Sequence, residues 1–541
     1  MDASLATGIA SLAIQLFSGS LSSYRALVTA FTQDISLEIL RCKLELEEQR
    51  FMLWGDASRI SQEQLGFPGA HIASILNSLQ AISNLISEAR TLAERNAVHL
   101  ATQETATNVP SNESRSVQVA SSVTRTARWV LDDKARLESI IRDLKDFNDS
   151  LNSLLYHNDR LELGKSFQKV CIETLSTETQ RKLEILEQSN LEDYRDLAFM
   201  AALRRAGLQL EGLNTGEQVD LGLRSSDGTS GFEARWIIDV PELHSRAPGD
   251  TMLCVNGESL HLEWKKLPDV GSPARHRVIQ RLQFLMNILG KSPKPADFCV
   301  LDLRGFAVHP DQAYVALAYS IPPTVVADSR FSLQELLTLK ELRKAYRPPL
   351  EGRVRLALRL CRCVLMLHTA GWLHKAIRPS NVMFFPPEYG ASIGALDSAY
   401  LIGFESARED ELAFTSDTVF TETLSTETEW QYYEHPLRQG EQKRKFSKVF
   451  DIYSLGLVLL DIALWNPFTA SLEGVEPTKA KSFVLKHLLQ GEVAFRVGSI
   501  YEDVIRQCIT GNLYNVRGVT KNWREVAFWN NVIQKLELCN A

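Results

Sequence analysis

The sequence lacks several features that would assign it at once to a class of protein. No uninterrupted apolar run reaches the roughly 18 residues that a constitutive membrane span requires. None of the eight cysteines stands in a C-x-x-C motif, and the closest pair, Cys361 and Cys363, is separated by one residue. An N-terminal secretory signal is also missing, so we expect buried free thiols and a reducing, cytoplasmic setting. The net charge of −7 gives no whole-chain case for binding nucleic acid.

The size and composition indicate a globular protein with more than one core. At 541 residues the chain is too long for a single core, and its length predicts about two to four domains. Hydrophobic residues make up 45% of the chain and charged residues 23%, which is enough to bury cores of normal size. The pattern of residues changes near residue 211, which divides the chain into two halves joined by a connector.

The N-terminus carries very little charge. Between residues 1 and 31 the only charged side chains are Asp2 and Arg25. Apolar residues recur there at helical spacing: Leu5, Ile9, Leu12 and Leu16. Two interpretations stay open. The stretch is either the first core helix of a bundle, or a segment that packs at rest and enters a bilayer when it is released.

Three further stretches have the apolar spacing of amphipathic helices, at residues 35–46, 72–86 and 137–154. Residues 101–126, by contrast, are rich in Thr, Ser, Asn and Val without a sustained apolar face, which predicts a long loop. Four amphipathic helices within about 155 residues predict an antiparallel helical bundle. Residues 158–210 again show apolar residues at helical spacing, so we expect a helical connector there.

The last of these bundle helices resembles a known family. The run Arg128-Trp129-Val130-Leu131-Asp132-Asp133-Lys134, with Asp143-Leu144-Lys145-Asp146-Phe147-Asn148-Asp149-Ser150-Leu151 after it, is similar to the HeLo domain of fungal prion-inhibition-and-propagation proteins. The resemblance covers residues 1–157. It implies a helical bundle that oligomerises and damages membranes through its N-terminal segment.

A second resemblance begins at residues 374–381. The run His374-Lys375-Ala376-Ile377-Arg378-Pro379-Ser380-Asn381 has the outline of the protein-kinase catalytic loop H-R-D-L-x-x-x-N. In kinases the Asp accepts the proton of the substrate hydroxyl and the Asn holds a magnesium ion. Asn381 is present, but Ala376 stands at the position of the Asp, and a methyl group cannot accept a proton.

The metal-binding D-F-G motif of kinases is altered in the same way. Gly403, Phe404 and Glu405 fall at its three positions, so the main magnesium ligand is absent. Two alternatives stay open for Asn381, which either hydrogen-bonds within its loop or contacts a nucleotide or its metal. Glu405 is a second candidate, as a carboxylate ligand from a shifted position. We expect no catalytic residue and no metal ligand among these positions.

The strand-rich part before this loop is less like a kinase. Lys265, in the predicted strand 259–265, is the candidate for the lysine that contacts nucleotide phosphates. The predicted helix 271–290 contains no acidic residue that could pair with Lys265, and no Gly-rich phosphate loop precedes the predicted strand. Asp451, in the predicted helix 450–461, matches the kinase Asp that accepts hydrogen bonds from the catalytic-loop backbone.

These resemblances predict a multidomain chain. We expect an N-terminal all-α bundle (1–157), a helical connector (158–210) and a C-terminal α+β bilobal kinase-like domain (211–541) with a small lobe at 211–322 and a large lobe at 323–541. The same order of parts is similar to mixed lineage kinase domain-like pseudokinases. That likeness is one of architecture, and a fold alone does not prove a function.

Three functions follow as hypotheses. The first is a signalling pseudokinase that controls a membrane-active bundle in regulated cell death. Its expected partners are membrane lipids, an upstream signalling protein and further copies of the chain. The protein would move from the cytoplasm to the membrane on activation. The second is a divergent active protein kinase that transfers phosphate from ATP. The third is a soluble scaffold without membrane activity. We expect a chain that is not an enzyme and has no cofactor, while weak ATP binding without magnesium stays open.

Overall fold

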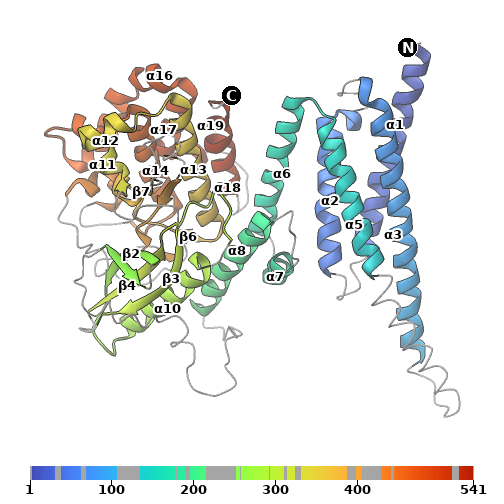
Figure 1. Cartoon of the computed structure of the whole chain (residues 1–541), viewed down its shortest axis with the longest axis horizontal. Coiled ribbons are helices and arrows are strands. Elements are labelled where there is room, and N and C mark those ends of the chain that lie inside the picture. The colour runs from blue at the N-terminus through green and yellow to red at the C-terminus, as the bar shows by residue number, and fades with distance from the viewer. Residues whose placement is uncertain are drawn as a thin grey trace. The chain divides into compact units, whose positions relative to one another are not determined.

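The computed structural model describes residues 3–30, 38–62, 69–106, 134–177, 179–188, 195–214, 251–255, 258–290, 293–309, 313–322, 330–386, 396, 398–404, 408–409, 428–439, 444–514 and 523–539. Contacts divide the chain into two compact units (Figure 1). The N-terminal unit comprises Met1–Cys171 and Ile185–Asn190, and the C-terminal unit comprises Ile172–Glu184 and Leu191–Ala541. Part of the predicted connector therefore belongs to each unit.

The N-terminal unit is a bundle of long helices. They are α1 (Ala3–Ala30), α2 (Glu38–Ala57), α3 (Ile72–Ala106) and α5 (Lys134–Ser153), with short 3-10 turns at Ile60–Gln62 and Gly69–His71. The predicted bundle is confirmed, but α3 extends into the stretch 101–126 that we predicted as loop. The remainder of that stretch from residue 107, and the start of the predicted helix 35–46, lie outside the described residues.

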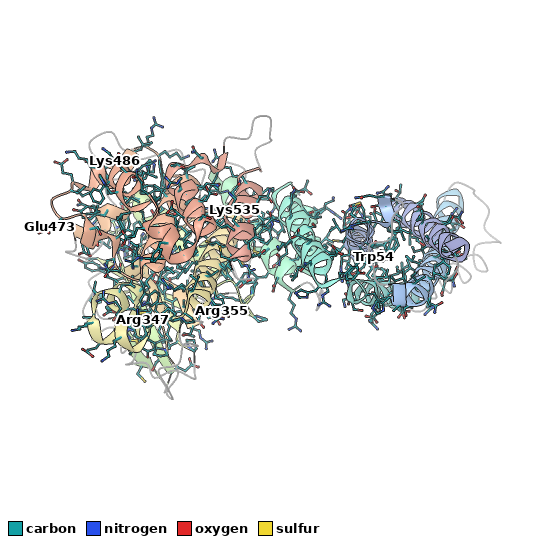
Figure 2. The ribbon with its side chains drawn as sticks, turned by 90° about the horizontal axis from the view of Figure 1, so that it is seen from above. Trp54, Arg347, Arg355, Glu473, Lys486 and Lys535 are labelled. Carbon is teal, nitrogen blue, oxygen red and sulfur yellow. The ribbon has the colours of Figure 1, made fainter. Side chains whose placement is uncertain are left out.

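Aromatic side chains fill the centre of this bundle. Phe17, Phe51 and Trp54 are almost fully buried, and the ring centroids of Phe17 and Phe51 are 4.9 Å apart. Figure 2, in which the bundle helices are seen end-on, shows Trp54 among them. Its indole Nε1 donates to the carbonyl oxygen of Leu151 at 3.1 Å, which satisfies the polar atom of an otherwise apolar core.

A buried polar network joins α2 to α5. The Asn148 side chain donates to Glu47 Oε2 at 2.9 Å and to the Glu47 carbonyl oxygen at 3.1 Å. Arg50 binds the same carboxylate at 3.1 Å and also pairs with Asp149. Because a buried charge needs such partners, this network fixes the two helices in one register. Asn148 and Asp149 lie in the stretch on which the HeLo resemblance rests.

Within the described residues, no helix is long and apolar enough to cross a membrane.

Three helices follow the bundle in the predicted connector: α6 (His157–Thr177), α7 (Gln180–Gln188) and α8 (Arg195–Asn214). The last of them packs within the C-terminal unit, against α10 and α13. The rings of Phe199 on α8 and Phe298 are 5.3 Å apart. A Cβ at Gly207 would lie 2.1 Å from the carbonyl oxygen of Ala370, so only glycine permits this close approach.

The first part of the C-terminal unit is a four-stranded antiparallel sheet in the order β1-β2-β4-β3, with α10 in the same region (Figure 1). Its elements are β1 (Met252–Val255), β2 (Glu258–Lys266), α10 (Pro273–Leu289), β3 (Asp302–Val308) and β4 (Tyr314–Ser320). The strand predicted at 259–265 and the helix predicted at 271–290 are confirmed. Leu260, Leu262 and Trp264 of β2 share one buried cluster, so the alternate residues of the strand face the other side.

The rest of the unit is mainly helical. Its α-helices are α11 (Leu333–Thr338), α12 (Lys340–Ala345), α13 (Leu350–Thr369), α14 (Lys448–Leu464), α15 (Ala480–Phe483), α16 (Glu492–Val497), α17 (Ser499–Thr510), α18 (Trp523–Phe528) and α19 (Gln534–Leu538). Single π-helical turns lie at Val484–Leu488 and Trp529–Ile533. Short 3-10 helices lie at Pro379–Asn381, Thr428–Tyr433, Pro436–Arg438, Phe468–Ser471, Pro477–Lys479 and Asn512–Tyr514. Almost every side chain of α14 is buried, which makes this helix the centre of the unit.

Two small antiparallel sheets complete the unit. One has the order β5-β7-β8, from β5 (Phe331–Ser332), β7 (Val382–Phe384) and β8 (Ala399–Leu401). The other pairs β6 (Trp372–Leu373) with β9 (Arg408–Glu409). The stretch 374–381 lies between β6 and β7, and residues 402–404 follow β8, so the two predicted degenerate motifs both lie beside these short strands.

Candidate functional site

The loop at residues 374–381 is anchored to the central helix α14. Both oxygens of the Asp451 carboxylate accept backbone N–H groups at 2.8 Å, one from His374 and the other from Lys375. His368 Nε2, at the end of α13, lies 3.1 Å from the same carboxylate. Asp451 is completely buried, so these contacts replace the water that its charge would otherwise need. The aspartate thus fixes the start of the loop.

His374 is part of the core of the site. Burial lowers its pKa to about 4, so the ring is neutral at neutral pH. Its Nδ1 accepts the backbone N–H of Ala376 at 3.3 Å, and its ring meets Phe404 edge-on with centroids 4.7 Å apart. The histidine therefore packs the loop against residues 402–404 and is not poised as a proton donor at neutral pH.

Asn381 is directed into its own loop. Its side-chain amide donates to the carbonyl oxygen of Ala376 at 2.8 Å, and only 8% of the residue is exposed. Its backbone carbonyl oxygen accepts the N–H of Ile402 at 2.9 Å. The residues Ala376, Asn381 and Gly403 that the motifs predicted to form one site are thus brought together by the fold.

Gly403 has no room for a side chain. Its φ of +91° lies in the region that favours glycine. A Cβ built there would lie 2.3 Å from Nδ2 of Asn381, a distance that real Cβ atoms do not show. An aspartate at this position would therefore require the backbone or Asn381 to move. Glycine therefore fits this position without a change in the surrounding residues.

A carboxylate of β2, which no sequence motif indicated, lies beside Gly403. Oε1 of Glu263, in β2, accepts the N–H of Gly403 at 2.6 Å, and Oε2 accepts the N–H of Phe404 at 2.9 Å. Oε2 also accepts the hydroxyl of Tyr319 at 3.1 Å. Glu263 is 8% exposed. Three donors converge on this buried carboxylate, which ties the four-stranded sheet to residues 402–404.

A sequence signal for Glu263 was available. Glu263 stands between Leu262 and Trp264 in the middle of the predicted strand, and glutamate is rarely buried unless it is paired. Lys265 lies two residues further along β2, on the same face as Glu263, and is half-buried. The face of β2 that carries the predicted phosphate-binding lysine therefore also carries an acidic residue.

Two predicted features lie outside the described residues: Glu405, and residues 215–250, where a phosphate-binding loop would belong. Arg275 of α10 donates to the carbonyl oxygen of Pro268 at 3.0 Å, so it lies near the end of β2. Among the residues that the structure describes, no group of three His, Cys, Asp or Glu side chains could hold a metal ion.

All eight cysteines are free thiols, and Cys299, Cys361, Cys363 and Cys508 are buried. Burial raises the pKa of Cys361 well above its usual value and that of Cys508 to about 12, so both remain protonated at neutral pH.

The comparison with known families concerns the N-terminal unit, which is an all-α bundle. The HeLo family, described as prion-inhibition and propagation, matches residues 4–186, which include the four long helices of the bundle, α6 and most of α7. The predicted HeLo resemblance of the N-terminal part is therefore confirmed, and the match continues beyond residue 157 into the predicted connector. No curated protein matches the chain.

Proposed function

We propose that the chain is a signalling pseudokinase, in which a kinase-like C-terminal unit without phosphoryl-transfer chemistry controls a membrane-active N-terminal bundle. HeLo domains are associated with fungal cell-death and heterokaryon-incompatibility signalling. A pathway of this type, or a related one of innate immunity, would use the bundle as the effector and the C-terminal unit as the sensor of an upstream signalling protein.

The kinase-like assignment is supported by the order of elements in the C-terminal unit. An antiparallel sheet with a helix after its second strand precedes α13, the loop 374–381, residues 402–404 and the buried helix α14. The hydrogen bonds from the loop backbone to Asp451 and the contact between His374 and Phe404 are those that a kinase-like core would make. This support concerns the fold, and the function has to come from the site.

The observation that carries the proposal is the position of the Glu263 carboxylate. It binds the backbone N–H groups of Gly403 and Phe404, at the place where a kinase presents its magnesium-binding aspartate. A cation there would have to displace these donors, because magnesium demands near-ideal octahedral oxygen ligands. Ala376 removes the proton acceptor as well. We infer that this unit takes part in signalling through its conformation and its contacts.

The membrane part of the proposal concerns α1. This helix has only one basic and no acidic residue among residues 3–30, and Leu12 is 46% exposed on it. In the proposed cycle the chain is cytoplasmic at rest, and activation releases α1, assembles several copies and brings the apolar residues to membrane lipids.

Release of a trapped dye from vesicles that contain anionic lipid tests this proposal. A fragment of residues 1–190 and the full chain are compared at equal concentration, after circular dichroism has shown that the fragment is helical. We expect the fragment to release dye and the full chain to release little. Absence of release by a folded fragment would favour a soluble scaffold. Equal release by both would contradict control by the C-terminal unit.

A further inference from the structure

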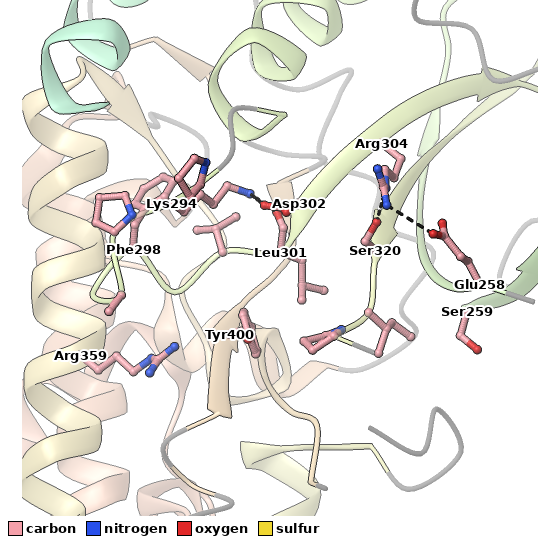
Figure 3. A pocket seen from close by; sticks show the side chains of 16 residues that line it. Glu258, Ser259, Lys294, Phe298, Leu301, Asp302, Arg304, Ser320, Arg359 and Tyr400 are labelled. Carbon is pink, nitrogen blue, oxygen red and sulfur yellow. Dashed lines mark hydrogen bonds and ion pairs between the residues drawn. The ribbon is translucent and has the colours of Figure 1, made fainter. Parts of the chain in front are cut away.

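A cavity of about 680 Å³ lies in the C-terminal unit, away from the site around Gly403 (Figure 3). Its walls come from the segment between α10 and β3, the first residues of β2 and β3, the end of β4, and single residues of α13 and β8. None of the residues that form the degenerate kinase-like site lines it. Its volume lies within the range of roughly 300–1,000 Å³ that holds small organic ligands.

Both carboxylates of the lining are bound to cations of the same wall. Lys294 Nζ lies 2.6 Å from Asp302, and the Arg304 guanidinium lies 3.5 Å from Glu258 (Figure 3). A charged ligand would therefore lose its water here without finding a counter-charge in either pair, and a charge that is buried without a partner is strongly disfavoured. The two ion pairs indicate that the cavity suits a ligand without a net charge.

Tyr400 offers a hydrogen-bond donor to the cavity. Among the residues that the structure describes, its hydroxyl has no hydrogen-bond partner. Burial raises the pKa of Tyr400, so the phenol keeps its proton at neutral pH and can donate a hydrogen bond to an oxygen atom of a ligand. The ring is held in place by the Arg359 guanidinium, 5.8 Å from its centroid, and by Phe385, which meets it edge-on at 5.7 Å.

The remaining wall is apolar and stiff. Phe298, Leu301 and Ile321 are buried apolar residues that line it, and prolines stand at positions 293, 295 and 322. Because proline fixes the backbone dihedral φ, this wall changes its shape little when a ligand enters. The transfer of apolar surface from water to such a wall is favourable, so most of a bound ligand would be apolar.

We propose that this cavity binds an uncharged organic molecule that is mostly apolar and carries one carbonyl oxygen. The oxygen accepts a hydrogen bond from the Tyr400 hydroxyl, and the apolar body lies against Phe298, Leu301 and Ile321. The site is separate from the degenerate kinase-like site and does not depend on the function proposed above. Because the walls come from both the four-stranded sheet and α13, a bound ligand holds these two parts of the unit together.

Two uncharged naphthalenes test the site by fluorescence. The ketone 6-propionyl-2-(dimethylamino)naphthalene has a carbonyl oxygen, and its emission moves to shorter wavelength in apolar surroundings. The reference compound, 2-(dimethylamino)naphthalene, has the same ring system without the carbonyl group. Both are titrated into the full chain. We expect the ketone to bind saturably, with one such site for each chain, and more tightly than the reference compound, whereas absence of saturable binding would refute the site.

Two tyrosines provide a matched pair of variants. Tyr400→Phe removes the hydroxyl and keeps the ring, whereas Tyr314→Phe makes the same change on β4 outside the lining. We expect Tyr400→Phe to weaken the ketone roughly fivefold, as for the loss of one neutral hydrogen bond, and to leave the reference compound unchanged. Tyr314→Phe should leave both affinities within about twofold. An unchanged ketone affinity in Tyr400→Phe, or an equal loss for both compounds, would overturn the proposal.

Competition tests the preference for an uncharged ligand. The full chain is first saturated with the fluorescent ketone, and 2-acetylnaphthalene or naphthalene-2-sulfonate is then added. These competitors share a ring system, but only the second is an anion. We expect the sulfonate to need a concentration roughly tenfold higher than the uncharged ketone, because the ion pairs of the lining offer it no counter-charge. Displacement by both at equal concentration would show that the cavity does not select an uncharged ligand.

Two further variants show whether the probes bind in this cavity. Ala296→Trp and Ser259→Trp add a large side chain from two different parts of the lining, the segment after α10 and the start of β2. In each variant that keeps the wild-type urea midpoint, both naphthalenes should bind at least roughly tenfold more weakly. Wild-type affinity in both variants would refute the site. If Tyr400→Phe does not fold, equal affinity of the wild type for the two naphthalenes would refute the hydroxyl contact instead.

Discussion

Replacing Glu263 by Gln tests the contact between β2 and the backbone of residues 403 and 404. The carboxylate accepts backbone N–H groups with both oxygens, from Gly403 at 2.6 Å and from Phe404 at 2.9 Å. A glutamine of the same size keeps one oxygen, and its NH₂ group would face the other N–H. One of the two buried backbone donors therefore loses its acceptor.

The magnitude follows from this loss. Hydrogen bonds to a charged group contribute about 1.5–3 kcal/mol, and an unsatisfied buried donor costs about 1–3 kcal/mol. The neutral amide is easier to bury than the carboxylate, which offsets part of the loss. We expect a net destabilisation on the order of 2 kcal/mol, which corresponds to roughly thirtyfold faster local opening.

Hydrogen exchange of the full chain measures this opening directly. A peptide that contains residues 399–404 should exchange roughly thirtyfold faster in Glu263→Gln than in the wild type, provided that exchange follows the opening equilibrium. Glu341→Gln, which alters an exposed glutamate of α12, is the control and should leave this peptide unchanged. Wild-type exchange in Glu263→Gln, together with an unchanged urea midpoint, would refute the proposed role of the carboxylate.

Three further changes test the surroundings of the site. Gly403→Asp should destabilise the chain by roughly 2 kcal/mol, because φ at this residue is +91° and Asn381 fills the space that a side chain would need. The variant should also not bind magnesium. A folded variant that binds the metal in calorimetry would contradict this expectation. Asp451→Asn should lower the free energy of unfolding in urea by on the order of 3 kcal/mol, because the buried carboxylate accepts two backbone N–H groups. A loss below about 1 kcal/mol would show that Asp451 does not hold the loop in place. Because burial lowers the pKa of His374 from 6.5 to about 4, the stability that its neutral ring provides is complete above pH 6.5 and is lost as the pH falls towards 4. Between pH 7 and pH 5 the wild type should therefore lose on the order of 2 kcal/mol more than His374→Gln, and equal losses would refute this sign.

The long elements of the chain could be predicted from sequence. α2, α3 and α5 lie where the apolar spacing predicted helices, because burial of one face is a local signal that repeats along an element. The end of α3 could not be predicted in this way. Once a helix is formed, each added residue gains a hydrogen bond, so α3 continues to Ala106 through polar residues that show no apolar face.

The candidate site could be predicted only in part. The motifs predicted that Ala376, Asn381 and Gly403 form one site, and in the structure the Asn381 side chain lies beside both other residues. The contact of Glu263 with Gly403 joins residues 140 positions apart, and no local pattern reports such a pair. The positive φ of Gly403 and its contact with Asn381 likewise result from packing. The sequence motifs did not include Glu263, whose carboxylate accepts the N–H groups of Gly403 and Phe404.

Calorimetric titration of the full chain with ATP, with and without magnesium, tests the central claim most directly. With the donors of Gly403 and Phe404 already bound to Glu263, we predict weak ATP binding or none, and no gain in affinity when magnesium is added. A large magnesium-dependent gain that Glu263→Gln abolishes would contradict this account, because the carboxylate would then be a metal ligand of a divergent kinase.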